Sequence, residues 1–545
     1  MALRACIPLA LVVVISAGCS NASNEKVLLA VRDSGAATGR TETKSDSKYD
    51  MRFRTAHSSG LTFAQVPAHG GSAIVNGKPY DAAFFKDHGT NPFVDADDDH
   101  RSTFALDVDT ASYTVARSYL KDGRLPPPEA VRVEEFVNYF EYGYGAPHDR
   151  AFAIDVDGAR SHWGRNRHLL RVGLQARTVK ASRREDAVLT FVIDVSGSMQ
   201  QENRLELVKR SLRYLVDQLG EDDRVGIVTY GTNAEVVLRH VGMEERDDIL
   251  DAIDDLEPEG STNAEAGLRE GYRLASKAFR PGAVNRVILC TDGVANVGAT
   301  GPDQILEEVA RYVKNGITLT AVGFGMENFN DVLLERLGDR GNGHYAYIDG
   351  FDEAKRLFGR DLTSTLQLVA REARIQVDFD PATVRSWRLI GYENRDMADD
   401  RFRDKHTDGG EVGAGHSVTA LYEVKSWDDE IAHPRWNGRV ATIRLRWRDP
   451  ESDRWEEITE QVEAHDLEGD FDRASSSFQL AVAAAEFAEI LHRSPWAKER
   501  SLDWVLEIAR GVEGDVADRK EVRELVDLVE RARRLGGDRK DVAAD

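Results

Sequence analysis

Between about residues 188 and 358, short apolar runs alternate with segments whose apolar residues recur at helical spacing. The segment 205–219 carries six apolar residues on one helical stripe. This alternation predicts a doubly wound α/β fold, with a mostly parallel sheet covered by helices on both faces. Ligands of such a sheet bind at the carboxyl ends of its strands. The expected strands are 188–193, 225–230, 236–238, 287–290, 317–324 and 344–348.

The length of 545 residues is too great for one core and indicates several domains. Strand-like segments at 152–174 and 373–447 lie on either side of the α/β domain. Because the two ends of a domain commonly lie close together, we predict that these segments join in one β domain into which the α/β domain is inserted. The expected organisation is a signal peptide (1–18), a flexible tether (19–99), a small helical module (100–148), a β segment (149–185) that joins 372–465, the α/β domain (186–360), a β-rich extension (361–465) and a helical C-terminal region (466–545).

The tether is predicted from a stretch rich in Ser, Gly, Ala, Thr and Asp with weak periodicity. It ends in an acidic patch of Asp95, Asp97, Asp98 and Asp99. The patch lacks the Gly and the distal Glu of a calcium loop, so we interpret it as a solvated linker.

The formal net charge of −23 excludes broad classes of partner. A protein that neutralises phosphates needs a local excess of Lys and Arg, and no basic run interleaved with aromatic residues supplies one. Nucleic acid and anionic lipid surfaces are therefore not expected ligands.

The N-terminus predicts export. Arg4 precedes an apolar stretch at 7–15, and Ser16, Ala17 and Gly18 lead into Cys19. This order is typical of a secretory signal, and the stretch is shorter than the roughly 20 residues of a spanning helix.

Small residues before Cys19 resemble the bacterial lipobox, in which the Cys becomes the lipidated first residue of the mature chain. The family prefers Leu where this chain has Ser16, so ordinary cleavage and secretion stay an alternative. Cys6 would leave with the signal, which leaves Cys290 as a free thiol and allows no disulfide within the mature chain. We expect a lipid-anchored protein of the bacterial cell envelope.

One constellation of oxygen donors falls at the ends of predicted strands. Asp194, Ser196 and Ser198 alternate directly after the first strand, and Gly197 allows a tight bend. Thr262 precedes a helix and Asp292 ends another strand. Three loops should therefore converge at one edge of the sheet.

This constellation resembles the metal-ion-dependent adhesion site of the von Willebrand factor A family, which integrin inserted domains also contain. The resemblance covers residues 186–358 and implies the doubly wound, Rossmann-like fold of that family. It implies that Ser196 and Ser198 ligate a metal directly, that Asp194 and Asp292 bind it directly or through water, and that Thr262 ligates directly in the high-affinity state.

The residue types agree with this chemistry. Hydroxyl and carboxylate oxygens without thiolate or imidazole favour Mg²⁺ or Mn²⁺, which keeps several waters and can give one coordination position to a ligand. Two carboxylates do not over-neutralise the ion, so it should attract a Glu or Asp carboxylate of a partner protein. The alternative interpretation is that Asp194, Ser196, Thr262, Asn263 and Asp292 merely cap helices.

The flanking segments 107–113, 125–128 and 389–394 resemble bacterial lipoproteins of the same domain family that have N- and C-terminal extensions. This second resemblance covers most of residues 91–545.

We therefore expect a metal-dependent binding protein and not an enzyme. A static envelope scaffold with a structural metal is one alternative. A phosphatase that uses Asp107 and Asp109 is another, although Ala111 stands where such enzymes have Thr or Val. We interpret His344 and His416 as isolated structural residues.

Overall fold

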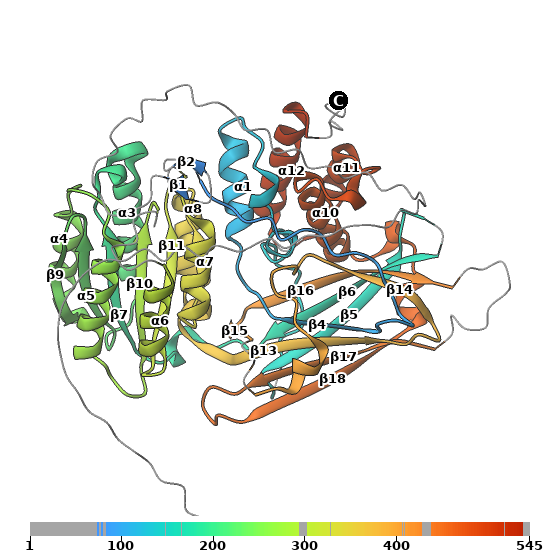
Figure 1. Ribbon diagram of the computed structural model, residues 1–545, viewed down its shortest axis with the longest axis horizontal. Helices are drawn as coiled ribbons and strands as arrows, with labels where there is room; N and C mark the ends of the chain where they lie inside the picture. The colour runs from blue at the N-terminus through green and yellow to red at the C-terminus, as the bar shows by residue number, and fades with distance from the viewer. Residues whose placement is uncertain are drawn as a thin grey trace, which may run out of the picture. The chain divides into compact units, whose positions relative to one another are not determined.

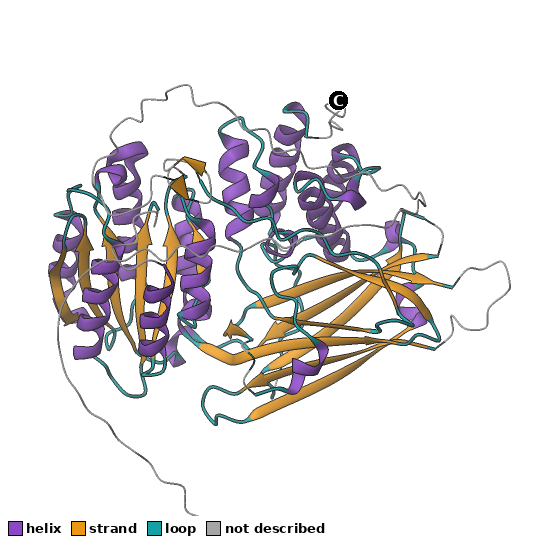
Figure 2. Cartoon of the chain, in the orientation of Figure 1, coloured by secondary structure: helices purple, strands orange, loops and turns teal. Residues whose placement is uncertain are grey.

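A computed structural model describes residues 74–75, 78–79, 83–147, 149–164, 166–293, 302–326, 329–405, 407, 409–427, 438–516 and 518–537. The predicted signal peptide and Cys19 lie outside these ranges. The described residues form one mostly parallel sheet with helices, two five-stranded antiparallel sheets and a C-terminal group of helices (Figures 1 and 2). The short strands β1 (Ile74–Val75) and β2 (Lys78–Pro79) form a further, two-stranded antiparallel sheet. None of the described helices is long and apolar enough to cross a membrane.

The α/β domain contains a six-stranded sheet in the order β12-β11-β10-β7-β8-β9. Neighbouring strands are parallel except for β8 and β9, which form an antiparallel edge. The predicted fold class is confirmed. The strands are β7 (Ala187–Asp194), β8 (Arg224–Tyr230), β9 (Ala234–Gly242), β10 (Val284–Thr291), β11 (Ile317–Gly323) and β12 (Tyr345–Tyr347).

Side chains of β7 alternate between two cores, because successive residues of a strand point to opposite faces. Leu189 and Phe191 pack under α3 and α4, whereas Val192 packs under α5 with the cluster that also holds α6 and α7. The sheet is therefore covered on both faces (Figure 1). These helices are α3 (Arg204–Asp217), α4 (Arg246–Asp254), α5 (Ala264–Lys277), α6 (Pro302–Val313) and α7 (Asp331–Arg340); α8 (Phe351–Lys355) follows β12.

The two five-stranded antiparallel sheets share one apolar core and form a β sandwich. One has the order β15-β13-β17-β18 with β4 beside β13, and the other has the order β3-β14-β16-β6-β5. The strands are β3 (Val94–Asp95), β4 (Arg101–Ala105), β5 (Phe152–Arg160), β6 (Arg167–Ala176), β13 (Leu368–Phe379), β14 (Val384–Ile390), β15 (Gly410–Gly413), β16 (Ser417–Ser426), β17 (Arg439–Arg448) and β18 (Trp455–Glu463).

The α/β domain is inserted into this sandwich. β6 precedes the domain and β16 follows it, and the two strands pair from Ser417 opposite Gln175 to Lys425 opposite Arg167. The segments before and after the α/β domain therefore belong to one sheet, as their strand-like patterns predicted.

The prediction of a separate helical module at 100–148 is wrong. β4 pairs with β13, and α1 (Ala111–Lys121) and α2 (Val133–Val137) share a core with the C-terminal helices. Phe136 of α2, for example, lies 5.9 Å from Phe487 between ring centroids. Two short helices cannot bury their apolar faces alone, so they pack on α10 (Ser476–Leu491), α11 (Leu502–Val512) and α12 (Arg519–Arg534).

The tether also ends earlier than predicted. From residue 83 onward the chain packs on the fold: Phe85 lies 6.2 Å from Phe329 between ring centroids, and β3 pairs with β14. The four predicted linker Asp residues are exposed, but they lie in and just after β3. Isolated apolar residues such as Phe85 produce no periodic pattern, so a segment rich in small and polar residues was predicted to be a tether.

Candidate metal centre

The first loop of the centre begins where β7 ends. Asp194 is fully buried at this point, at 0% exposure. Its Oδ1 accepts a hydrogen bond from the backbone N–H of Ser196 at 2.9 Å, and its Oδ2 accepts one from the Thr291 hydroxyl at 2.9 Å. The carboxylate thus connects the loop after β7 to the end of β10. Ser196 stands before a short 3-10 helix, but its side chain makes no capping hydrogen bond.

The hydroxyls continue this connection. Ser196 Oγ lies 3.0 Å from Ser198 Oγ, and Ser198 Oγ donates to Oδ1 of Asp292 at 3.0 Å. Asp292 follows β10 and is 2% exposed. Four of the five predicted ligands therefore form an unbroken series of polar contacts.

The loop that carries Thr262 lies against the first loop through its backbone. Gly197 donates to the carbonyl of Gly260 at 3.1 Å, and Asn263 donates to the carbonyl of Gly231 at 3.0 Å. Gly260 has φ +75°, and a Cβ there would lie 2.3 Å from Thr232 Oγ1, so glycine is needed for this close approach. The segment that carries Thr262 is therefore held against the loop after β7 and the end of β8, whereas Asn263 caps α5 as its alternative interpretation expected.

The electrostatics of the centre are unfavourable for two ionised carboxylates. Burial, reinforced by the negative charge of Asp292, raises the pKa of Asp194 to about 7. Burial also raises the pKa of Asp292, against the hydrogen bonds that it accepts from Ser198 and Arg204. A cation among these oxygens would relieve the repulsion.

The donor set fits a hard divalent cation. Among the described residues, His, Cys, Asp and Glu form no group of three or more with metal-binding geometry. The centre instead combines two carboxylates with serine and threonine hydroxyls, which are oxygen ligands of the kind that Mg²⁺ accepts while keeping several waters.

Sequence reasoning missed Arg204, the first residue of α3. Its Nη1 donates to Oδ2 of Asp292 at 3.0 Å, and only 3% of its side chain is exposed. An Arg at the first turn of a helix opposes the helix dipole, and this is the one signal that could have marked it.

Two apolar residues near the centre belong to the core. Met199 and Cys290 are both fully buried in the core under α3.

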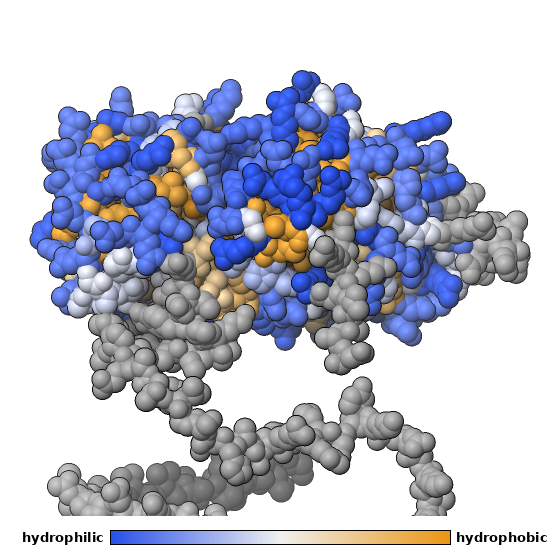
Figure 3. Space-filling model, turned by 90° about the horizontal axis from the view of Figure 1, so that it is seen from above, coloured by the Kyte–Doolittle hydropathy of each residue, from blue (hydrophilic) through white to orange (hydrophobic). Residues whose placement is uncertain are grey.

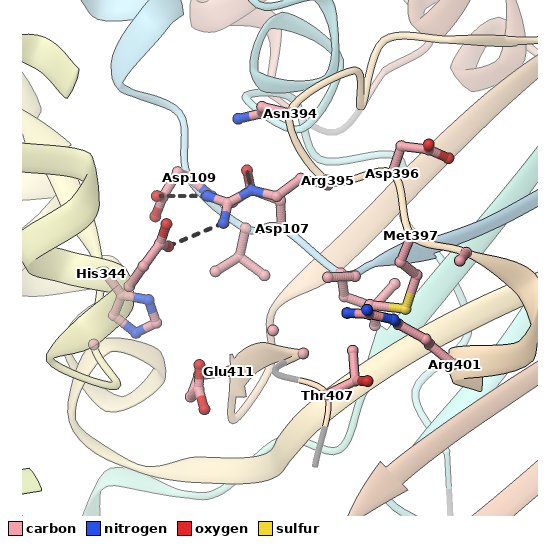
Figure 4. A pocket seen from close by; sticks show the side chains of 18 residues that line it. Asp107, Asp109, His344, Asn394, Arg395, Asp396, Met397, Arg401, Thr407 and Glu411 are labelled. Atoms are coloured by element: carbon pink, nitrogen blue, oxygen red, sulfur yellow. Dashed lines mark hydrogen bonds and ion pairs between the residues drawn. The ribbon is translucent and has the colours of Figure 1, made fainter. Parts of the chain in front are cut away.

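A second site brings together Asp107 and Asp109, the residues of the phosphatase alternative (Figure 4). They line a cavity of about 510 Å³ with Arg395 and His344. Asp107 accepts hydrogen bonds from Arg395 Nε at 2.8 Å and from the backbone N–H of Asp109 at 2.9 Å, while Asp109 accepts one from Tyr345 N at 3.2 Å. Both carboxylates therefore hold neighbouring segments in place.

One prediction is corrected at this cavity, and one carboxyl there has a shifted pKa. His344 is not isolated, since its ring lies 5.3 Å from that of His416 between centroids. Burial and the charge of Asp107 raise the pKa of Asp109 well above its usual range, so this carboxyl is kept protonated beside the Asp107–Arg395 pair.

Family models match three parts of the chain. Residues 189–360 match the model described as von Willebrand factor type A domain, residues 79–171 match von Willebrand factor, and residues 364–535 match Uncharacterized protein YfbK, C-terminal. Fold and matches together define a protein with a von Willebrand factor type A domain and extensions on both sides.

The extensions point to a particular family. The chain is 33% identical over 454 residues to the Uncharacterized protein YfbK of Escherichia coli (strain K12), covering 79% of this chain and 78% of the relative. The chain therefore belongs to the YfbK family.

Other similarities cover less of the sequence or are weaker. The Uncharacterized protein sll0103 of Synechocystis sp. is 32% identical over 189 residues, covering 35% of this chain and 44% of that protein. Inter-alpha-trypsin inhibitor heavy chain H3 of Homo sapiens is 29% identical over 163 residues, covering 28% of this chain and 18% of that protein. A solved structure, von Willebrand factor type A from Catenulispora acidiphila, is 16% identical with a TM-score of 0.42 and covers 72% of this chain and 98% of its own.

Proposed function

We propose that the chain is a cell-envelope binding protein whose metal centre recognises a Glu or Asp carboxylate on a partner protein. One observation carries the proposal: Asp194, Ser196, Ser198 and Asp292 form a continuous series of contacts across two strand-end loops. Type A domains are often adhesive, protein-binding modules, which agrees with this assignment.

The five proposed ligands would bind Mg²⁺ or Mn²⁺ through two kinds of oxygen. Ser196, Ser198 and Thr262 supply neutral hydroxyls, and Asp194 and Asp292 supply the negative charge. A bound dication would offer an open coordination position to an incoming carboxylate. Because the hydroxyls are neutral, the five residues would not over-neutralise the ion, and it could still accept that carboxylate.

The face at the carboxyl ends of the parallel strands also favours a polar partner. Figure 3 views the molecule from this side, and the coloured residues are mainly hydrophilic with hydrophobic residues in small groups. A polar ligand at a charged centre suits this face better than an apolar segment does.

The metal is tested by isothermal titration of Mn²⁺ into the purified full chain. We expect Asp194→Asn, which keeps the shape of the side chain, to weaken Mn²⁺ binding at least about tenfold, because an anionic ligand is lost. Asp223→Asn is the matched control: Asp223 is 2% exposed and accepts a hydrogen bond from Ala187 N at the opposite end of β7. It should bind Mn²⁺ like the wild type, and equal binding by Asp194→Asn would refute the metal centre.

The static-scaffold alternative is separated from this proposal by a chelator. A pull-down from envelope extract with and without EDTA, with circular dichroism of both samples, compares partner capture with folding. Capture that disappears while the fold persists supports recognition through the metal. Capture that is unchanged by EDTA supports the scaffold.

We also propose that the chain is anchored by lipid at Cys19, a residue outside the described ranges. Labelling with radioactive palmitate should mark the wild type and not Cys19→Ser. Cys6→Ser is the matched control, since Cys6 leaves with the signal peptide, and it should stay labelled. Equal labelling of the wild type and Cys19→Ser would contradict the anchor.

A further inference from the structure

Arg204 places a full positive charge against the metal centre. Its Nη1 donates a hydrogen bond to Oδ2 of Asp292, and the Ser198 hydroxyl donates one to Oδ1, both at 3.0 Å. Each oxygen of this carboxylate is therefore held by a different loop or helix start. Charge-assisted contacts of this kind are stronger than neutral ones and fix orientation as well as charge.

The loop after β11 is shaped to admit this side chain. Gly325 has φ +84°, and a Cβ at this position would lie 2.3 Å from Nε and 2.6 Å from Cδ of Arg204. Only glycine leaves room for the buried guanidinium, so the backbone that carries Gly325 accommodates Arg204. The exposed Glu202 contributes a contact of 3.3 Å to Nη2 of Arg204.

The guanidinium changes the charge of the centre. Two carboxylates alone would balance the charge of a dication, and Arg204 adds a positive charge to the centre. Glu202 is 74% exposed and offsets this charge only weakly, because solvent screens the pair, so the buried centre keeps a net positive charge when a dication is bound. Arg204 cannot lose its proton in the accessible pH range, so this charge is permanent. A positive neighbour opposes metal binding and favours an incoming anion, because the interaction falls only slowly with distance in a buried site.

We propose that Arg204 is a positioning and charge-setting residue: it orients Asp292, lowers the affinity of the centre for the dication, and raises the affinity of the metal-loaded centre for a carboxylate. This inference rests on the proposed function. If Arg204 only held α3 against the loop after β10, its loss would not change metal affinity and carboxylate affinity in opposite directions.

Two titrations of the full chain test the proposal. Electron paramagnetic resonance of free Mn²⁺ gives metal affinity, and the water-proton relaxation of the Mn²⁺-loaded protein gives displacement of bound water by acetate, the carboxylate probe. For R204Q, which keeps N–H donors but loses the charge, we expect Mn²⁺ to bind roughly tenfold more tightly and acetate roughly tenfold more weakly, the change of about one charge-assisted contact.

Two further variants isolate the charge. R204K keeps it, so both affinities should stay within about threefold of the wild type. R213Q is the matched control, because Arg213 lies on the same helix, is 38% exposed and pairs with Asp254, far along α3 from the metal loops. It should leave both titrations unchanged.

The outcomes separate the inference from the function beneath it. If the wild type binds no Mn²⁺, the proposed function fails and the inference with it. If the wild type binds Mn²⁺ but R204Q binds it equally or more weakly, or if R204K and R204Q behave alike, only the inference is overturned. Should R204Q not fold, Gly325→Ala displaces the same guanidinium, and it must then show tighter Mn²⁺ and weaker acetate binding.

Discussion

Replacing Arg388 by Met should weaken the attachment of the C-terminal helices to the β sandwich. Arg388 lies on β14 with 0% of its side chain exposed. Its Nε donates to Glu423 on β16 at 3.1 Å, and its two terminal nitrogens donate to the carboxylate of Glu489 on α10 at 3.1 and 3.2 Å. Met fills a similar volume but supplies no donor to these two buried carboxylates.

The magnitude follows from what remains after the substitution. Removing one partner of a buried ion pair costs about 3–5 kcal/mol, because the other charge stays buried and unpaired. Arg500 still contacts Glu423 at 2.7 Å and Glu489 at 3.3 Å, so the lower end of that range applies. For the compact unit Gln65–Asp545, a loss of about 3 kcal/mol corresponds to a fall in melting temperature of roughly 3 °C, because the entropy of unfolding is about 2.1 cal/mol/K per residue.

Urea and thermal unfolding, followed by circular dichroism, measure this loss. Arg444→Met is the matched control, since its pair with Asp378 is partly exposed, at 26% and 24%, and should cost less than about 1 kcal/mol. Adding Glu489→Gln to Arg388→Met should restore part of the stability by removing one orphaned charge. An Arg388→Met protein within about 1 kcal/mol of the wild type would refute the reasoning.

Three further predictions come from other buried positions. Gly271→Ala should destabilise the chain by roughly 1–3 kcal/mol, although Ala favours helices, because its Cβ would lie 2.3 Å from Val192 Cγ2. Thermal melts measure this loss, and adding Val192→Ala should restore stability. An unchanged melting temperature of Gly271→Ala would contradict the contact. Burial and the charge of Glu393 raise the pKa of Glu134 from 4.5 to about 8, so its stabilising contribution is complete below pH 4.5 and is lost as the pH rises through about 8. Melting temperatures from pH 5 to 9 should therefore show Glu134→Gln gaining on the wild type as the pH rises, and parallel curves would contradict this. Burial raises the pKa of the Cys290 thiol to about 12, so the native thiol should be unreactive. In a variant whose other two cysteines are replaced by Ser, Ellman's reagent should react with Cys290 only after unfolding. Rapid reaction of the native variant would contradict the burial of Cys290.

Much of the α/β domain could be predicted from the sequence because its signals are local. Each predicted strand overlaps an observed one, from 188–193 within β7 to 344–348 around β12. Strand and helix alternation itself implies a parallel sheet, and a parallel sheet brings its strand-end loops to one edge. Asp194, Ser198 and Asp292 could therefore be placed together without coordinates.

The errors lie where a segment depends on distant partners. The helices α1 and α2 were expected to form a module of their own, yet their apolar faces are covered by helices more than 330 residues later in the chain. Phe85 looked like part of a tether because a single aromatic residue has no period, and Phe329 buries it only in the folded chain.

The class of fold, the insertion of the α/β domain and the oxygen donors of the proposed metal centre follow from the sequence alone, because periodicity and strand-end motifs lie in neighbouring residues. The groups that surround those donors depend on the folded chain. The contact between Arg204 and Asp292 joins residues 88 positions apart, and the space for it depends on Gly325 in a third loop. The charge of the centre is therefore set by packing between loops, which no local pattern records.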